Sequence, residues 1–301
     1  MAYIKKLGAR LSLYLLILAL LSSSCSLNIG GANSKSAASA AVAQTADTLG
    51  IYVIDVGNAD SILVLNKGET LLIDAGENGD GDDVVNFIRS QGVESLDYVI
   101  ATHPDADHIG GMDVVINEIP IENFIMSIMP DSITPTTRTY IDMLEALDNK
   151  DVKVTEAVPG SRFTLGEAAV NILGPVGEFN STNNMSVVCR IDFGEFRFLF
   201  MGDAENEAEN ALMKNNADVK ADFIKIGHHG SSSSSQPAFI KAVSPSYAVI
   251  SCGVGNRYKH PHSETLSLLK SREIDYYRTD INGTVTVLCD KKRIAIKTEK
   301  G

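Results

Sequence analysis

The chain has 301 residues, of which 44% are hydrophobic and 21% charged, and this composition excludes a disordered polyelectrolyte. Its formal net charge of −12 argues against a protein that binds nucleic acid through a basic surface. The six histidines fall in three close pairs, at 103 and 108, 228 and 229, and 260 and 262. Histidines scattered over a surface would not fall in this way.

The N-terminal segment predicts export. Basic residues precede an apolar run from Leu11 to Leu21, which has the length of a signal-peptide core rather than of a membrane span. Small residues then lead to Cys25, and this order resembles a bacterial lipoprotein signal. We therefore expect a signal peptide over 1–24 and a lipid anchor on Cys25, with ordinary secretion after cleavage nearby as the alternative. Residues 25–48, rich in Ser, Ala and Gly, are expected to form a flexible tether before one domain over 49–301.

The domain begins with three short β-branched runs at 51–57, 61–66 and 70–76, which turn residues divide and which predict strands. Further strands are predicted at 96–103, 169–175, 186–193, 196–203, 222–229, 247–253 and 283–290. Helices are predicted at 82–91, 108–117, 139–149, 205–215 and 263–270. Two strand-rich halves, each with helices, favour an α/β (α+β) fold of two packed sheets with helices outside. Polar residues gather where strands end, and catalytic groups belong on such loops because a rigid scaffold positions them.

One motif predicts a metal centre. The sequence THPDADHIGG at 102–111 places four side chains of the metal-ligand type within six residues, namely His103, Asp105, Asp107 and His108. Pro104 and the glycines predict a turn rather than a helix, and a turn lets neighbouring side chains converge on one point. Imidazole and carboxylate suit a hard or borderline divalent cation, whereas structural zinc sites draw more on thiolates.

This loop resembles the HxHxDH signature of the metallo-β-lactamase superfamily, with Asp105 in place of the middle His. The variant followed by two glycines is similar to the extracytoplasmic enzyme domain of the ComEC/Rec2 DNA-uptake family. Matching segments follow in order over 51–288: IDVGNADSILV, LLIDAG, NNMSVV, FLFMGDAE, IKIGHHGSSSS, NRYKHPH and YRTDINGTV. The resemblance implies an αββα sandwich of two mixed β-sheets with outer helices and a metal centre at one edge.

The resemblance also implies a set of ligands for one or two divalent ions, Zn²⁺ or Mn²⁺. A first metal would take His103, Asp105 and Asp203. A second would take Asp107, His108, Asp203 and one of the adjacent histidines His228 and His229, of which His229 is preferred. Asn183 and Asn184 stand where the superfamily normally has a further His. Loss of imidazole ligands favours Mn²⁺ relative to Zn²⁺ and puts full occupancy of the first site in question.

Other residues are expected to act around the metals. The expected catalytic residues are Asp107, His228 and His262. The residues expected to support the ligands or contact substrate are Asp55, Asn183, Asn184, Lys225, Ser231 and His260. Asp55 would orient the metal loop by hydrogen bonds, and Lys225 would add positive potential unless it is a solvated strand residue.

The predicted function is that of an exported metal-dependent hydrolase, a phosphodiesterase or nuclease whose phosphoester substrates include DNA. Metals would supply locally the positive charge that the net charge lacks. One alternative is a hydrolase of phosphorylcholine or another cell-envelope phosphoester. The other alternative is a metal-binding module without catalysis. The oligomeric state is not predicted.

Overall fold

The computed structural model describes Thr45 and residues 47–301. The predicted signal peptide over 1–24, the lipidation site Cys25 and nearly all of the tether over 25–48 lie outside these residues. Within the described part of the chain, no helix combines the length and apolar character that a bilayer span requires.

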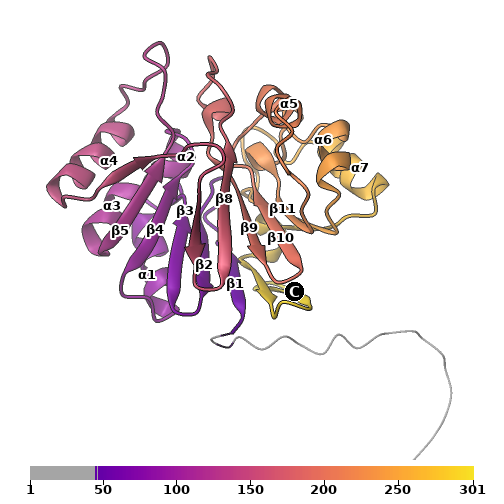
Figure 1. The fold of residues 1–301 in the computed structure, drawn as a ribbon, viewed down its shortest axis with the longest axis horizontal. Coiled ribbons are helices and arrows are strands. Elements are labelled where there is room, and N and C mark those ends of the chain that lie inside the picture. Colours follow the sequence, from indigo (N-terminus) through magenta and orange to yellow (C-terminus); the bar gives the residue numbers. More distant parts are fainter. Residues whose placement is uncertain (1–44, 46) are drawn as a thin grey trace, which may run out of the picture. The chain divides into compact units, whose positions relative to one another are not determined.

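Two mixed β-sheets lie face to face with helices on both outer sides (Figure 1). The order of strands is β15-β14-β1-β2-β3-β4-β5-β6 in the first sheet and β13-β12-β11-β10-β9-β8-β7 in the second. The strands of the first sheet are β1 (Leu49–Val53), β2 (Ile62–Asn66), β3 (Glu69–Ile73), β4 (Leu96–Ala101), β5 (Ile121–Met126), β6 (Val154–Glu156), β14 (Val285–Cys289) and β15 (Ile294–Thr298). Those of the second are β7 (Arg162–Leu165), β8 (Ala168–Gly174), β9 (Val188–Phe193), β10 (Phe196–Phe200), β11 (Phe223–Lys225), β12 (Tyr247–Ile250) and β13 (Asp275–Arg278).

The helices divide between the two outer faces. The longer helices over the first sheet are α1 (Gly81–Ser90), α3 (Met112–Glu118) and α4 (Arg138–Asn149). Those over the second sheet are α5 (Asn206–Lys214), α6 (Pro237–Val243) and α7 (Ser263–Ser271). Short turns complete the fold, namely α2 (Ala106–Ile109), α8 (Thr279–Asn282), η1 (Asn183–Met185) and η2 (Gly227–Gly230). This arrangement confirms the predicted fold class.

Alternation along the strands builds three layers of core. In β1, Ile51 and Val53 belong to the core between the sheets, whereas Tyr52 belongs to the core under the helices. In β10, Phe198 lies between the sheets and Leu199 packs under the helices of the second sheet. Both faces of each sheet are therefore buried, which fixes the sheets against each other and against the helices.

Strand direction brings the polar loops to one edge. Strands β3 to β6 run parallel to one another, and so do β10 to β13. The carboxyl ends of parallel strands meet at the same edge of a sheet, where ligands of open α/β sheets bind. The predicted strands at 96–103, 196–203 and 247–253 overrun the observed β4, β10 and β12 at this end, because the residues beyond them are loops.

The metal loop differs from the prediction in one respect. It contains a single helical turn, α2, which carries Asp107 and His108, where a turn without helix was predicted. The predicted helix at 108–117 is accordingly divided into the end of α2 and the start of α3. Gly110 permits the close approach of this loop to residue 78, since a Cβ atom there would overlap the backbone nitrogen of Asn78.

Candidate metal centre

The expected ligands lie on loops that follow three strands. His103 and the α2 turn follow β4, Asp203 follows β10 and His229 follows β11. Asp74 follows β3 in the same edge of the first sheet. Residues far apart in sequence thus reach one point because their strands end side by side.

Four of the expected ligands form one cluster. Asp107, His108, Asp203 and His229 each offer a ligand atom, and these atoms all lie within 4.8 Å of one another. His108 Nε2 is 3.2 Å from Asp203 Oδ1, and His229 Nε2 is 3.3 Å from Asp107 Oδ2. His229 Nε2 also lies 3.6 Å from Asp203 Oδ2. The spacing places the four side chains around a common centre.

The cluster fits a bound cation. His108 Nε2, His229 Nε2 and Asp203 Oδ1 are buried, and none has a hydrogen-bond partner among the described residues. A buried polar atom left without a partner costs about 1–3 kcal/mol. A divalent cation at the centre would satisfy all of these atoms together, and the mixture of imidazole and carboxylate suits such an ion.

Hydrogen bonds behind the ligands fix the orientation of both imidazoles. His108 Nδ1 lies 2.7 Å from Asp74 Oδ2, and His229 Nδ1 donates to the Ser251 carbonyl at 3.1 Å. Since a carbonyl oxygen only accepts, the Nδ1 of His229 carries the proton and its Nε2 lone pair faces the cluster. Thr102 secures Asp74 in turn, through its N–H at 2.8 Å and its hydroxyl at 2.7 Å. Such partners set the tautomer and basicity of metal-binding histidines.

The charges within the cluster support one another. Burial alone would raise the pKa of Asp203, but the neighbouring His229 and His108 outweigh it and hold that pKa well below its ordinary value. For Asp107, burial is likewise outweighed by the adjacent His229 and His108, which lower the pKa of that carboxyl to about 2. Burial opposes charge on His108, yet Asp203 and Asp74 raise its pKa well above the ordinary value. Both carboxylates are therefore ionised and ready to bind a cation.

His103 and Asp105 form a pair beside the cluster rather than within it. The Nε2 atom of His103 is 3.8 Å from Asp105 Oδ2, and the ring of His103 lies 4.1 Å from that of His108. His103 is buried, and its Nε2 has no hydrogen-bond partner within the described residues. Burial and the neighbouring His108 lower the pKa of His103, which leaves it as the neutral imidazole that binds metals.

His228 lies on the open side of the cluster. His228 and His229 both adopt left-handed backbone conformations, with φ values of 47° and 51°, and their rings meet at 71°. The Nε2 atom of His228 is 3.7 Å from Asp203 Oδ2, while its Nδ1 lies 3.0 Å from Glu205 Oε1. Strained conformations of this kind gather at functional sites. Glu205, which the sequence reasoning left without a role, stands in the FLFMGDAE segment.

Asn183 and Asn184 make different contacts in the region where the resemblance places them. The side-chain oxygen of Asn184 accepts the N–H groups of Glu205 at 3.0 Å and of Ala208 at 3.3 Å. Asn184 therefore holds the chain that carries Glu205. Asn183 Nδ2 lies 3.5 Å from His228 Nδ1.

His260 and His262 lie near the cluster, and a series of ring contacts joins them to it. The ring of His260 is stacked on that of His229, with centroids 6.3 Å apart, and burial together with nearby histidines lowers the pKa of His260 to about 4. His262 Nδ1 accepts the N–H of Ser232 at 3.0 Å, so its Nε2 carries the proton, which faces the Tyr258 carbonyl at 3.2 Å. Both nitrogens of His262 thus hold loops together. The hydroxyl of Ser231 lies 2.9 Å from that of Ser233.

Two of the expected roles need correction. The side chain of Lys225 is fully buried, where its ammonium pairs with Asp60 at 2.8 Å. Lys225 is therefore neither a solvated residue nor a substrate contact, and of its expected roles only support of the metal loop through Asp60 remains. Asp55 pairs instead with Lys300 at 2.9 Å. Asp60 takes the supporting position that was assigned to Asp55, because its N–H donates to the Asp107 carbonyl at 3.0 Å. Asp60 belongs to the same IDVGNADSILV segment, and burial was the information that the sequence lacked.

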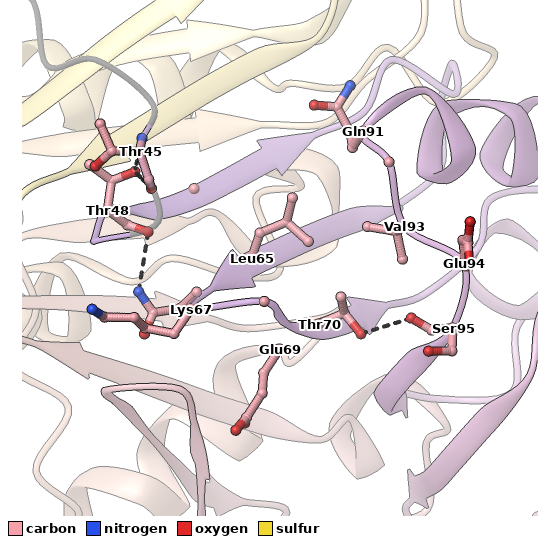
Figure 2. A pocket seen from close by; sticks show the side chains of 14 residues that line it. Thr45, Thr48, Leu65, Lys67, Glu69, Thr70, Gln91, Val93, Glu94 and Ser95 are labelled. Carbon is pink, nitrogen blue, oxygen red and sulfur yellow. Dashed lines mark hydrogen bonds between the residues drawn. The ribbon is translucent and has the colours of Figure 1, made fainter. Parts of the chain in front are cut away.

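A cleft of about 800 Å³ opens beside the cluster. The metal loop lines it through Asp105 and Asp107, and the loop after β12 lines it through Asn256, Arg257 and Tyr258. A smaller cavity of about 250 Å³ lies at the other end of the first sheet, where β4 begins (Figure 2). There the Thr70 hydroxyl donates to the Ser95 carbonyl at 3.1 Å, and the lining includes no expected site residue.

Comparisons with known proteins agree with the fold. The family model for the metallo-beta-lactamase superfamily matches residues 54–254. The chain is 31% identical to "ComE operon protein 3" of Bacillus subtilis over 254 residues and 29% identical to "Competence protein ComA" of Neisseria gonorrhoeae over 237 residues. Each alignment covers 78% of this chain but only 32% and 31% of those proteins, so the chain spans about a third of their length.

Among solved structures, CmlA, a diiron beta-hydroxylase from Streptomyces venezuelae, superposes with a TM-score of 0.52 at 15% identity. The match covers 79% of this chain and 53% of CmlA, and it concerns the fold alone. The two packed sheets, the cluster at their edge and the family match over most of the domain lead to one conclusion. The chain belongs to the metallo-beta-lactamase superfamily.

Proposed function

We propose that the protein is a metal-dependent phosphodiesterase whose substrate is a DNA strand. The observation that carries the proposal is the four-residue cluster of Asp107, His108, Asp203 and His229, which lies at the wall of a large open cleft. The relative named for competence, and the resemblance to the DNA-uptake family, support DNA over other phosphodiesters.

The four residues would hold one divalent ion, and His103 and Asp105 would hold a second with Asp203. Bound ions of this kind lower the pKa of a bound water and stabilise the charge on a phosphodiester. The two oxygens of Asp203 face different histidines, so this one carboxylate can contribute to both metal positions. Zn²⁺ and Mn²⁺ are the two ions to compare.

His228 is suited to handle the leaving group. Its side chain is 24% exposed, and Glu205 holds its Nδ1 so that Nε2 points toward Asp203. When water adds to phosphorus and the P–O bond breaks, the departing oxygen requires a proton. His228 Nε2 can supply this proton, and Glu205 stabilises the protonated ring.

The test is a substrate comparison with the purified chain. Bound metals are quantified, and rates are measured on DNA, bis-p-nitrophenyl phosphate and p-nitrophenyl phosphorylcholine with Mn²⁺ and with Zn²⁺. We expect cleavage of DNA and of the small diester, and loss of both in Asp107→Ala and Asp203→Ala. Unchanged rates in these variants would refute the metal mechanism. Turnover of the choline ester without DNA cleavage would favour a cell-envelope phosphoester as substrate.

We also propose that the protein is exported and attached to the membrane through a lipid on Cys25. The basic N-terminus, the apolar run and the small residues before Cys25 support this assignment. Cell fractionation tests it, since the protein should leave the membrane fraction in Cys25→Ser. Equal distribution of the two proteins would remove the anchor.

A further inference from the structure

The cleft beside the metal cluster has an uneven distribution of charge. Three acids line it, namely Glu77, Asp105 and Asp107. Of the residues that line the cleft within the described part of the chain, Arg257 is the only cation. No ion pair to Arg257 is found among the described residues, although the chain carries a net charge of −12. An anionic substrate therefore meets one unneutralised positive side chain in this cleft.

The loop that carries Arg257 is built rigidly. The Asn256 side chain donates to the carbonyls of Gly253 at 2.9 Å and His260 at 2.6 Å, and its oxygen accepts the His260 N–H at 2.9 Å. At the far end of the loop, His262 bridges the Ser232 N–H and the Tyr258 carbonyl. Arg257 is thus exposed on a loop whose backbone is fixed on both sides.

Ring contacts connect Arg257 to the metal cluster. The guanidinium carbon of Arg257 lies 4.6 Å from the centroid of the Tyr258 ring, and Arg257 also donates to the Tyr258 hydroxyl. Tyr258 is stacked on His260, with an interplanar angle of 21°, and His260 is stacked on His229 at 19°. Stacking on an aromatic face holds an Arg side chain and leaves its N–H groups available to an anion. The guanidinium is therefore held at a set position relative to His229.

We propose that Arg257 binds a phosphate of the substrate other than the one that is cleaved. This inference rests on the proposed phosphodiesterase function and deepens it, because it assigns a residue that recognises a chain of phosphates. A strand with successive phosphates gains a charge-assisted contact at Arg257, whereas an isolated diester does not. The acids of the cleft repel phosphates elsewhere along its wall. Arg257 is thereby a specificity-determining residue that favours polynucleotide chains over small phosphodiesters.

The experiment compares two substrates in the full chain. Arg257→Met removes the charge and keeps an unbranched side chain, and Arg257→Lys keeps the charge without the planar fork. The matched control is Lys292→Met, which removes the same charge at the exposed turn between β14 and β15, outside the cleft. Kinetic constants are measured on an oligothymidylate and on bis-p-nitrophenyl phosphate over a range of salt concentrations.

In Arg257→Met, we expect the KM for the oligothymidylate to rise about ten-fold, since charge-assisted hydrogen bonds carry binding of that order. The slope of log KM against log salt should fall by about 0.7, the share of one phosphate contact on a single strand. The constants for the small diester should stay within about two-fold. The KM of Arg257→Lys for the oligothymidylate should lie between those of Arg257→Met and the unaltered chain. The KM of Lys292→Met should match that of the unaltered chain.

A second readout needs no turnover. Fluorescence anisotropy of a labelled oligothymidylate in the presence of a chelator should show weaker binding by Arg257→Met than by Lys292→Met. Cleavage with an unchanged oligonucleotide KM and unchanged anisotropy in Arg257→Met would overturn this inference alone. Equal effects on both substrates, or equal effects of Lys292→Met, would also overturn it. Absence of metal-dependent cleavage of either substrate by the unaltered chain would overturn the proposed function as well.

Discussion

The substitution Asp74→Asn isolates the support of a metal ligand from the ligand itself. Asp74 is fully buried and accepts the Thr102 N–H at 2.8 Å and the Thr102 hydroxyl at 2.7 Å. Its Oδ2 also lies 2.7 Å from His108 Nδ1. Asp74 has a φ of 60°, a left-handed conformation that Asn adopts as readily as Asp. The substitution therefore changes the hydrogen bonds while it keeps the shape and the backbone.

The change acts through the tautomer of His108. The oxygen of the introduced amide retains the bond from the Thr102 N–H, so the amide nitrogen faces His108 Nδ1 and donates to it. The proton of His108 then moves to Nε2, which faces Asp203 Oδ1 at 3.2 Å and is no longer a lone-pair ligand. Loss of such supporting partners costs about 10–100-fold in metal affinity. This range corresponds to about 1.4–2.8 kcal/mol of binding free energy.

The assay is a competitive titration of Mn²⁺ and Zn²⁺ against a fluorescent chelator. Asp97→Asn is a matched control, because Asp97 Oδ2 accepts the Thr70 N–H and hydroxyl, both at 2.8 Å, at the opposite end of β4. Both variants lose comparable structural contacts, but only Asp74→Asn should lose metal affinity. Wild-type affinity in Asp74→Asn would refute the role of Asp74, and equal losses in both variants would show a global effect on folding.

Three further outcomes are expected. A hundred-fold excess of metal over its dissociation constant should stabilise the protein by about 2.7 kcal/mol, and a thermal-shift measurement should show no such gain in Asp203→Ala. Burial raises the pKa of Glu209 to about 7 from 4.5, so the folded state holds its proton more tightly and stability falls as pH rises through that window. The fall is up to about 3 kcal/mol, and urea unfolding of Glu209→Gln at several pH values should lack it. Gly110→Ala should lower the free energy of unfolding by about 1–3 kcal/mol, because its Cβ would overlap the Asn78 nitrogen, and a stability equal to wild type would show that the loop gives way.

The sequence alone predicts the layers of the fold because most of its central strands are short apolar runs bounded by turn residues. The interior strand β5 and the four strands at the edges of the sheets, β6, β15, β7 and β13, are not predicted. β6, β13 and β15 are largely or partly exposed and so lack a strong apolar pattern. The sequence also suffices to predict the metal loop, because four side chains of the metal-ligand type lie within six consecutive residues.

Only the tertiary structure determines the role of each polar residue. The sequence presents Asp55 and Asp60 as two acids of one segment, yet packing buries Asp60 against Lys225 and leaves Asp55 with Lys300. It presents His228 and His229 as neighbours, yet backbone geometry aims one ring into the cluster and leaves the other against Glu205. Local patterns record the periodicity of single strands. The convergence of loops from different strands depends on how the two sheets pack, and it is this packing that places the centre.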